Sequence, residues 1–242
     1  MLKILKHDIK DSWREIVILN AVLIVLSFFP LLGNAVESNF LFSLGMTAWV
    51  LALIACSAVI TIGVIKGLNT MLFTDSGYLT LTTPISIDKI LISKILVNML
   101  WVLTTTVSII LSVLLFSSAM FGEVMYLLPG AFRLIAENPL GTFLTILIIF
   151  SYILFAITML LFILTLLNVS TNKRYKILKG YLIYWALSSF VGVVNIFIAL
   201  AILGAGGSFT LFSVVLSLIN LVWSVAFYFT GRYLIINKLE LE

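Results

Sequence analysis

Long uncharged runs alternate with short charged segments along the chain, and this pattern predicts where its helices lie. A charged group at the centre of a bilayer costs at least ~2.5–3.5 kcal/mol, so charges mark the ends of membrane spans. A transmembrane helix needs about 20 mainly apolar residues, and five uncharged runs are long enough for one. The runs are residues 16–36, 38–65, 95–122, 138–172 and 180–231.

The last uncharged run is long enough for two helices. Gly204, Gly206, Gly207 and Ser208 lie near its middle and are typical of a turn. The pattern therefore predicts six transmembrane helices, and an even number places both ends of the chain on one side of the membrane. We expect an all-α integral membrane protein with a single transmembrane domain over residues 1–242.

Composition supports a lipid-facing chain. Hydrophobic residues make up 62% and charged residues 10% of the sequence, and the mean hydropathy is +1.25. An ordinary soluble domain has roughly 45–50% apolar and about 25% charged residues. So few charges cannot cover the surface of a soluble globule of this size, and most of that surface must face lipid.

The basic residues predict the orientation. With six spans, 13 of the 14 Lys and Arg residues fall on one side, and the other side receives only Arg133. An excess of Lys and Arg marks the cytoplasmic side, so we expect both termini in the cytoplasm and a multi-pass protein of the cytoplasmic membrane. The basic charge is spread over segments that flank helices, which accounts for it without nucleic acid.

The first segment, residues 1–15, has the spacing of an amphipathic helix. Leu2, Leu5, Ile9 and Trp13 recur every three or four residues between lysines and an arginine. Such a helix lies in the cytoplasmic interface of the membrane, with its basic side chains toward anionic lipid. The alternative is a plain extension of the first span into water.

Residues 119–139 form the sizeable segment on the outer side. The segment contains Pro129, Pro139 and many apolar residues. These features predict a short helix on the outer interface that caps an exit pathway. A plain connecting loop with interfacial residues explains them equally well.

The cytoplasmic loop over residues 66–89 carries more specific residues than a connector needs. A turn signal ends at Gly77, and Pro84 comes just before residues that can start the next helix. Between them, Tyr78 and Leu79 would be costly in water unless they were buried against lipid or a partner.

From Phe73 to Ser86 this loop reads FTDSGYLTLTTPIS, and Lys89 and Lys94 follow it. The sequence resembles the membrane (permease) subunit of a bacterial type 2 ATP-binding-cassette (ABC) exporter. In that family the loop between spans two and three forms a coupling helix that docks in a groove of a separate ATPase subunit. The resemblance implies docking contacts at Phe73, Asp75, Tyr78 and Leu79, a turn permitted by Gly77 and a change of direction at Pro84.

The close match is confined to this loop, and the remaining agreement is topological. The resemblance implies two permease chains, either identical or paired with a homologue, and ABC ATPase subunits that bind the ATP. The chain departs from many type 2 exporters at residues 203–210, which leave little room for an outer hairpin between the last two spans. A loop that packs only on its own helix bundle is the alternative to docking.

The sequence gives no sign of catalytic chemistry. It has no Gly-x4-Gly-Lys-Ser/Thr loop, no Ser/His/Asp or Cys/His set and no metal-ligand cluster, and its one cysteine, Cys56, lies in an apolar run. We expect no catalytic, cofactor-binding or metal-binding residues in this chain. No ionisable residue lies at the centre of a predicted span, which argues against a self-powered secondary carrier.

Three predicted spans carry stripes of small and polar residues at heptad-like spacing. Asn98, Thr105 and Ser108 belong to the third span, Asn195 to the fifth and Asn220 to the sixth. These residues are candidates for the lining of a transport pathway. Close helix packing with interhelical hydrogen bonds is the alternative.

Two functions remain open on the sequence. The first is an ABC exporter permease that moves an amphipathic or hydrophobic cargo, such as an antimicrobial peptide, a drug or a lipid. The second is a non-transporting membrane module for immunity or sensing, which binds a toxin or a signalling partner. Stoichiometric binding of an ATPase at the cytoplasmic loop distinguishes the first from the second.

Overall fold

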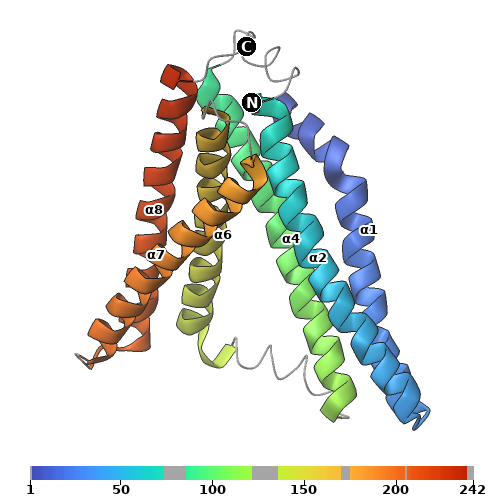
Figure 1. Cartoon of the computed structure of the whole chain (residues 1–242). Helices are drawn as coiled ribbons and strands as arrows, with labels where there is room; N and C mark the ends of the chain where they lie inside the picture. The colour runs from blue at the N-terminus through green and yellow to red at the C-terminus, as the bar shows by residue number, and fades with distance from the viewer. Residues whose placement is uncertain (1, 74–85, 122–135, 170–174, 205, 239–242) are drawn as a thin grey trace. The chain divides into compact units, whose positions relative to one another are not determined.

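The computed structural model describes residues 2–73, 86–121, 136–169, 175–204 and 206–238, and within these ranges the chain is helical with no strand. Six helices in these ranges are long and apolar enough to cross a membrane, which agrees with the predicted all-α class and its six spans. The helices are α1 (Leu2–Ala35), α2 (Asn39–Phe73), α4 (Ile87–Phe121), α6 (Pro139–Val169), α7 (Lys176–Gly204) and α8 (Phe209–Lys238) (Figure 1).

Several helices continue past the charges that flank the uncharged runs. α2 passes Lys66, α8 passes Arg232, and α4 begins before Lys89 and Lys94. Backbone groups in lipid must be satisfied within the helix, and long basic side chains reach the interface from positions inside a span. The segment between α2 and α4 is therefore shorter than the predicted loop, running from the end of α2 at Phe73 to the start of α4.

The predicted N-terminal helix is the first part of α1, because α1 is continuous from Leu2 to Ala35. The stretch that is long and apolar enough to cross a membrane is Ser12–Ala35. Asp8, which precedes that stretch, is only 7% exposed. The position of this first part of α1 in the cytoplasmic interface of the membrane remains a prediction.

The chain divides into two compact units, which we describe separately. Unit 1 consists of Met1–Val64 and Leu96–Pro139, and unit 2 of Ile65–Ile95 and Leu140–Glu242.

In unit 1, α1 and α2 pack closely through two glycines. A Cβ atom at Gly45 would lie 2.8 Å from the backbone nitrogen of Pro30, and one at Gly33 would lie 2.4 Å from that of Phe42. Small residues allow membrane helices to approach this closely, where van der Waals packing holds them together. Later in the same unit, the ring of Trp49 in α2 stacks on that of Phe116 in α4, with centroids 4.2 Å apart.

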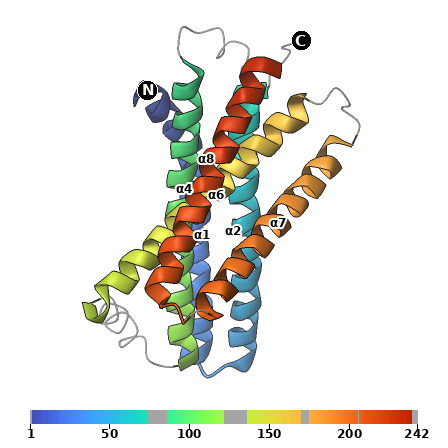
Figure 2. The ribbon, with the colours of Figure 1, turned by 90° about the vertical axis from the view of Figure 1, so that its left-hand side faces the viewer.

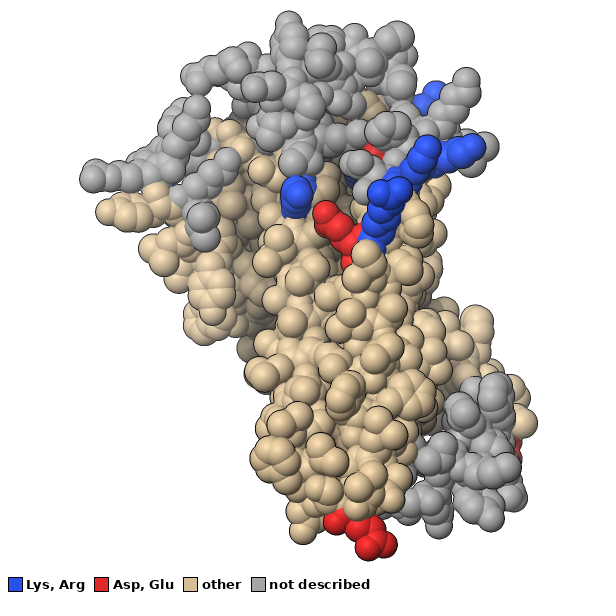
Figure 3. Space-filling model, turned by 90° about the vertical axis from the view of Figure 1, so that its right-hand side faces the viewer, with Lys and Arg blue, Asp and Glu red and all other residues tan. Residues whose placement is uncertain are grey.

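The charges of α1 all precede residue 16, and the next charge along the chain is Glu37 in the turn after the helix. On the face drawn in Figure 3, the charged side chains among the described residues gather in separate groups. The surface between them is uncharged, as a lipid-facing belt requires.

The α1–α2 and α7–α8 turns are closed in the same way. Glu37 and Gly206 have left-handed backbones, with φ of 55° and 70°. After each, an N–H bonds a carbonyl five residues back, from Ser38 to Gly33 and from Gly207 to Ile202, as in a Schellman motif. A serine then caps the next helix, since Ser38 and Ser208 each accept a backbone N–H three residues on. The glycine and serine turn predicted near the middle of the last uncharged run lies here.

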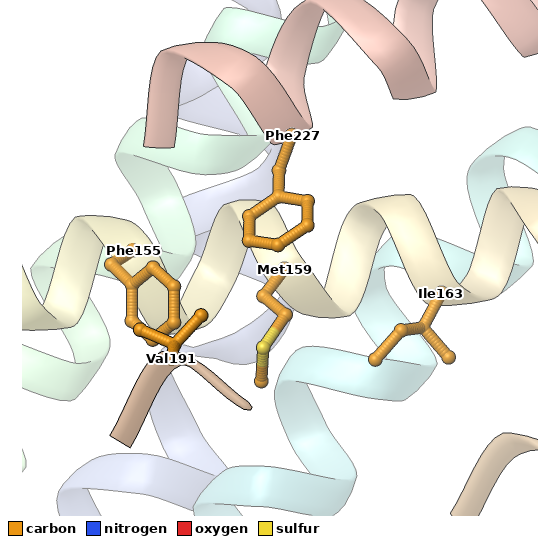
Figure 4. Close-up of a cluster of buried hydrophobic side chains, with 5 residues drawn as sticks. All are labelled: Phe155, Met159, Ile163, Val191 and Phe227. Carbon is orange, nitrogen blue, oxygen red and sulfur yellow. The ribbon is translucent and has the colours of Figure 1, made fainter. Parts of the chain in front are cut away.

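Unit 2 has a core of buried apolar side chains from three helices, drawn in Figure 4. Phe227 of α8 lies near the rings of Phe155 and Phe162 of α6, with centroids 6.0 and 5.4 Å away. α7 and α8 meet at their connecting turn and diverge from it (Figures 1 and 2). The buried members of the core are Phe155, Met159, Ile163, Val191 and Phe227.

Candidate functional site at the start of α4 and the end of α8

The residues predicted to dock an ATPase lie between α2 and α4. Phe73 is the last residue of α2. Asp75, Gly77, Tyr78, Leu79 and Pro84 lie outside the described residues, so their docking role stays a prediction. The part of this region that the structure describes in atomic detail is the first turn of α4.

α4 begins directly after Ser86, whose carbonyl accepts a hydrogen bond from the N–H of Lys89 at 3.0 Å. Asp88 lies in this first turn. A carboxylate is favourable there, because the unpaired N–H groups at a helix start carry partial positive charge.

The carboxylate of Asp88 is held by two side chains of α8. Arg232 Nε donates to Asp88 Oδ1 at 2.5 Å, and Arg232 Nη2 donates to Oδ2 at 3.1 Å. The hydroxyl of Tyr228 donates to Oδ1 at 3.1 Å. The two-pronged contact of a guanidinium with a carboxylate fixes direction as well as distance. The cluster therefore sets the orientation of the last turns of α8 against the start of α4.

This cluster is held at the margin of two spans. The side chains of Arg232 and Asp88 are 38% and 41% exposed, so both are half-buried. Asp88 and Arg232 fall within the stretches Ile87–Ser117 and Phe209–Asn237, which are long and apolar enough to cross a membrane. Pairing lowers the cost of placing two charges near lipid, because each neutralises the other.

The sequence pattern does not reveal this cluster. Arg232 directly follows the last uncharged run, and Asp88 is among the residues after Pro84 that can start a helix. Tyr228 and Arg232 are four residues apart, which places them on one face of α8, and that spacing was the available signal. Their partner is 140 or more residues away in the sequence, so the pairing depends on which helices are neighbours.

The predicted pathway residues of α4 are buried. Asn98 is 7% exposed, Thr105 2% and Ser108 9%. The hydroxyl of Ser108 donates to the carbonyl of Thr104 in its own helix. The hydroxyl of Thr105 has no hydrogen-bond partner among the residues that the structure describes. All three residues belong to unit 1.

The corresponding residues of α7 and α8 belong to unit 2. Asn220 is 2% exposed, and within the described part of the chain its side-chain oxygen has no hydrogen-bond partner; the same holds for the buried oxygen of Asn195. The neighbouring hydroxyls of Ser217 and Ser224 donate to carbonyls of α8 itself. Buried polar stripes fit both a pathway lining and helix packing, so the pathway stays a prediction.

In the described ranges, no three residues among His, Cys, Asp and Glu come together in a way that could hold a metal ion. Cys56 is buried in α2. Among the described residues, the Asp88 cluster is the best-formed polar arrangement, and it offers ionic and hydrogen-bonding contacts.

Comparisons with known proteins give no relative: no family model, curated protein or solved structure matches the chain. The function must therefore be argued from the fold, the loop and the contacts described above.

Proposed function

We propose that the chain is the transmembrane permease subunit of an ABC exporter. The observation that carries the proposal is the sequence FTDSGYLTLTTPIS between α2 and α4, which resembles the coupling loop of type 2 exporter permeases. The six apolar helices supply the membrane domain that such a subunit requires.

In this proposal both termini and the loop lie in the cytoplasm, as the distribution of Lys and Arg favours. The first part of α1 lies in the cytoplasmic interface of the cell membrane. A second permease copy or a homologue completes the pathway, and separate ATPase subunits bind the ATP. The chain itself contributes no catalytic group.

The cargo in this proposal is amphipathic or hydrophobic, for example a peptide, a drug or a lipid. The buried stripes that include Thr105 and Asn220 offer hydroxyl and amide groups without charge. Such groups can bind polar parts of a mainly apolar molecule without the cost of a buried ion.

The test is purification of the tagged chain from its native cell in mild detergent, with identification of the chains that copurify. We expect a Walker-motif ATPase in equimolar amount. Phe73→Ala with Tyr78→Ala should abolish its copurification while the protein still inserts, because these two side chains are the apolar docking contacts.

The matched control removes the same two kinds of side chain from α7. Phe197 and Tyr181 are 69% and 66% exposed, and their double alanine variant should retain the ATPase. A chain that purifies without any ATPase contradicts the proposed function and favours an immunity or sensor module. An ATPase that stays bound to the loop variant contradicts docking through this loop.

A further inference from the structure

We infer that Asp88, Tyr228 and Arg232 transmit the motion of the coupling loop to α8. This inference rests on the proposed function, since it needs an ATPase that pulls on the loop. It assigns positioning roles to residues that lie outside the predicted docking motif. The motion passes from the loop to α4, from α4 to α8, and α8 in turn packs on α6.

The first step is covalent. The predicted docking residues end at Pro84, and α4 begins at Ile87. Asp88 is therefore in the first turn of the helix that follows the loop. A helix is stiff over a few turns, so a displacement of the loop end is passed to Asp88 with little loss.

The second step is the cluster itself. Three hydrogen bonds join the Asp88 carboxylate to α8, two from Arg232 and one from Tyr228. A bidentate contact resists rotation as well as separation. The last turns of α8 must therefore follow the first turn of α4.

The third step is packing on the adjacent face of α8. Phe227 and Gly231 each precede a member of the cluster by one residue, so they form a second stripe about 100° around the helix. A Cβ at Gly231 would lie 2.8 Å from Leu161 Cδ2 and 3.7 Å from the Cα of Phe162, so α8 is in close contact with α6. Two turns of α8 thus contact both α4 and α6, and all of these contacts lie in unit 2.

A cluster that only stabilises the fold would leave the transmission of motion unchanged in protein that has folded. The experiment therefore measures motion on the two sides of the cluster separately. It uses the complex copurified with its ATPase, with Cys56→Ala to remove the native thiol. Lys89→Cys reports on α4 and Asn237→Cys reports on α8, because both side chains are exposed.

The measurement is the rate of labelling by a fluorescent maleimide, with and without ATP and vanadate. In the parent complex, we expect ATP and vanadate to change the labelling rate of both reporter cysteines. With Arg232→Gln, the Lys89→Cys reporter should keep its response, and the response at Asn237→Cys should fall several-fold. Arg232→Lys should retain part of the Asn237→Cys response, because lysine keeps the positive charge but loses the two-pronged contact.

Lys10→Gln is the matched control, because it removes one positive charge from an exposed position of α1 outside the cluster. It should leave both responses unchanged. If Arg232→Gln does not yield folded complex, Tyr228→Phe removes one hydrogen bond and keeps the ring, and it should reduce the Asn237→Cys response alone.

The outcomes separate the two proposals. An unchanged Asn237→Cys response in Arg232→Gln, or in Tyr228→Phe where that variant is needed, overturns the transmission role and leaves the exporter standing. A parent complex without an ATPase, or with no response at either reporter, overturns the exporter and the transmission role together.

Discussion

The indole Nε1–H of Trp101 donates a hydrogen bond to Ser12 Oγ, 2.9 Å away, and so joins α4 to the first half of α1. Ser12 Oγ in turn donates to the carbonyl of Asp8 at 2.9 Å. Trp101 is 8% exposed, so its N–H has little access to water. This chain of two bonds fixes the start of the first span against α4 within unit 1.

Removing the acceptor should therefore destabilise the protein. Ser12→Ala leaves the buried N–H of Trp101 unpaired, and we expect a loss of roughly 1–2 kcal/mol in the free energy of unfolding from mixed micelles. Trp101→Phe removes the donor as well as part of the ring. A double-mutant cycle isolates the bond, with an expected coupling of about 0.5–2 kcal/mol. Additive single effects would show that the contact contributes nothing.

The left-handed residue of the α1–α2 turn predicts a stabilising change. Glu37 is exposed and has a φ of 55°, which costs a non-glycine residue about 1 kcal/mol. Glu37→Gly should raise the free energy of unfolding by up to about that amount, because glycine adopts this backbone freely.

Two companion variants separate backbone strain from charge. Glu37→Gln removes the charge and keeps the Cβ atom, so its stability should match the parent. Gly206→Ala makes the reverse change in the α7–α8 turn, where φ is 70° and a Cβ would meet no atom within 4 Å. It should lower stability by about 1 kcal/mol. Equal stabilities for the Gly and Gln variants at position 37 would refute the strain.

The aromatic core of unit 2 allows a prediction of how much its loss lowers the free energy of unfolding. Phe227 is 6% exposed and lies near the rings of Phe155, Phe162 and Trp223. Phe227→Ala should destabilise by less than the ~3–5 kcal/mol typical of a soluble core, because lipid tails are as apolar as the lost neighbours. What is lost is ring packing, at about 0.5–1.5 kcal/mol per pair.

Phe229 provides the control for this change, because it lies two residues further along α8 and is 59% exposed. Phe229→Ala should leave the unfolding free energy nearly unchanged. Unfolding in mixed micelles measures both variants, and equal losses would show that Phe227 is not part of a packed core.

The helices could be predicted from the sequence because backbone groups in lipid must be hydrogen-bonded within the chain. Uncharged runs of the required length must be helical in lipid, and both the six spans and the glycine turn before Ser208 follow from that. The helix ends were predicted less accurately than the helices. The uncharged runs end before Lys66 and Arg232, whereas α2 and α8 continue past these residues. A long basic side chain reaches the interface from within a span, so its position does not mark the last helical turn.

Pairings between helices could not be predicted in the same way. Asp88 and Arg232 are 144 residues apart, and nothing in the local sequence selects one partner over another basic residue. The left-handed backbone of Glu37 could not be predicted either. Glycine is the usual residue at such a helix end, and this turn has a glutamate there instead. The spacing predicts the polar stripes through Thr105 and Asn220. It does not distinguish a pathway lining from close helix packing.

A close helix contact in unit 1 gives the sharpest prediction. A Cβ at Gly45 would lie 2.8 Å from the nitrogen of Pro30 and 2.9 Å from the carbonyl carbon of Phe29, both backbone atoms that cannot rotate away. Gly45→Ala should therefore force α1 and α2 apart and lower the free energy of unfolding, although alanine is the better helix former by about 1 kcal/mol.

Gly63 is the matched control on the same helix, since a Cβ there would meet nothing within 4 Å. Gly63→Ala should be neutral or stabilising by up to about 1 kcal/mol, because only helix propensity changes. The two variants should thus shift stability in opposite directions when unfolding is measured in the same mixed micelles. If Gly45→Ala were as stable as Gly63→Ala, the close approach of α1 and α2 at Pro30 would be wrong.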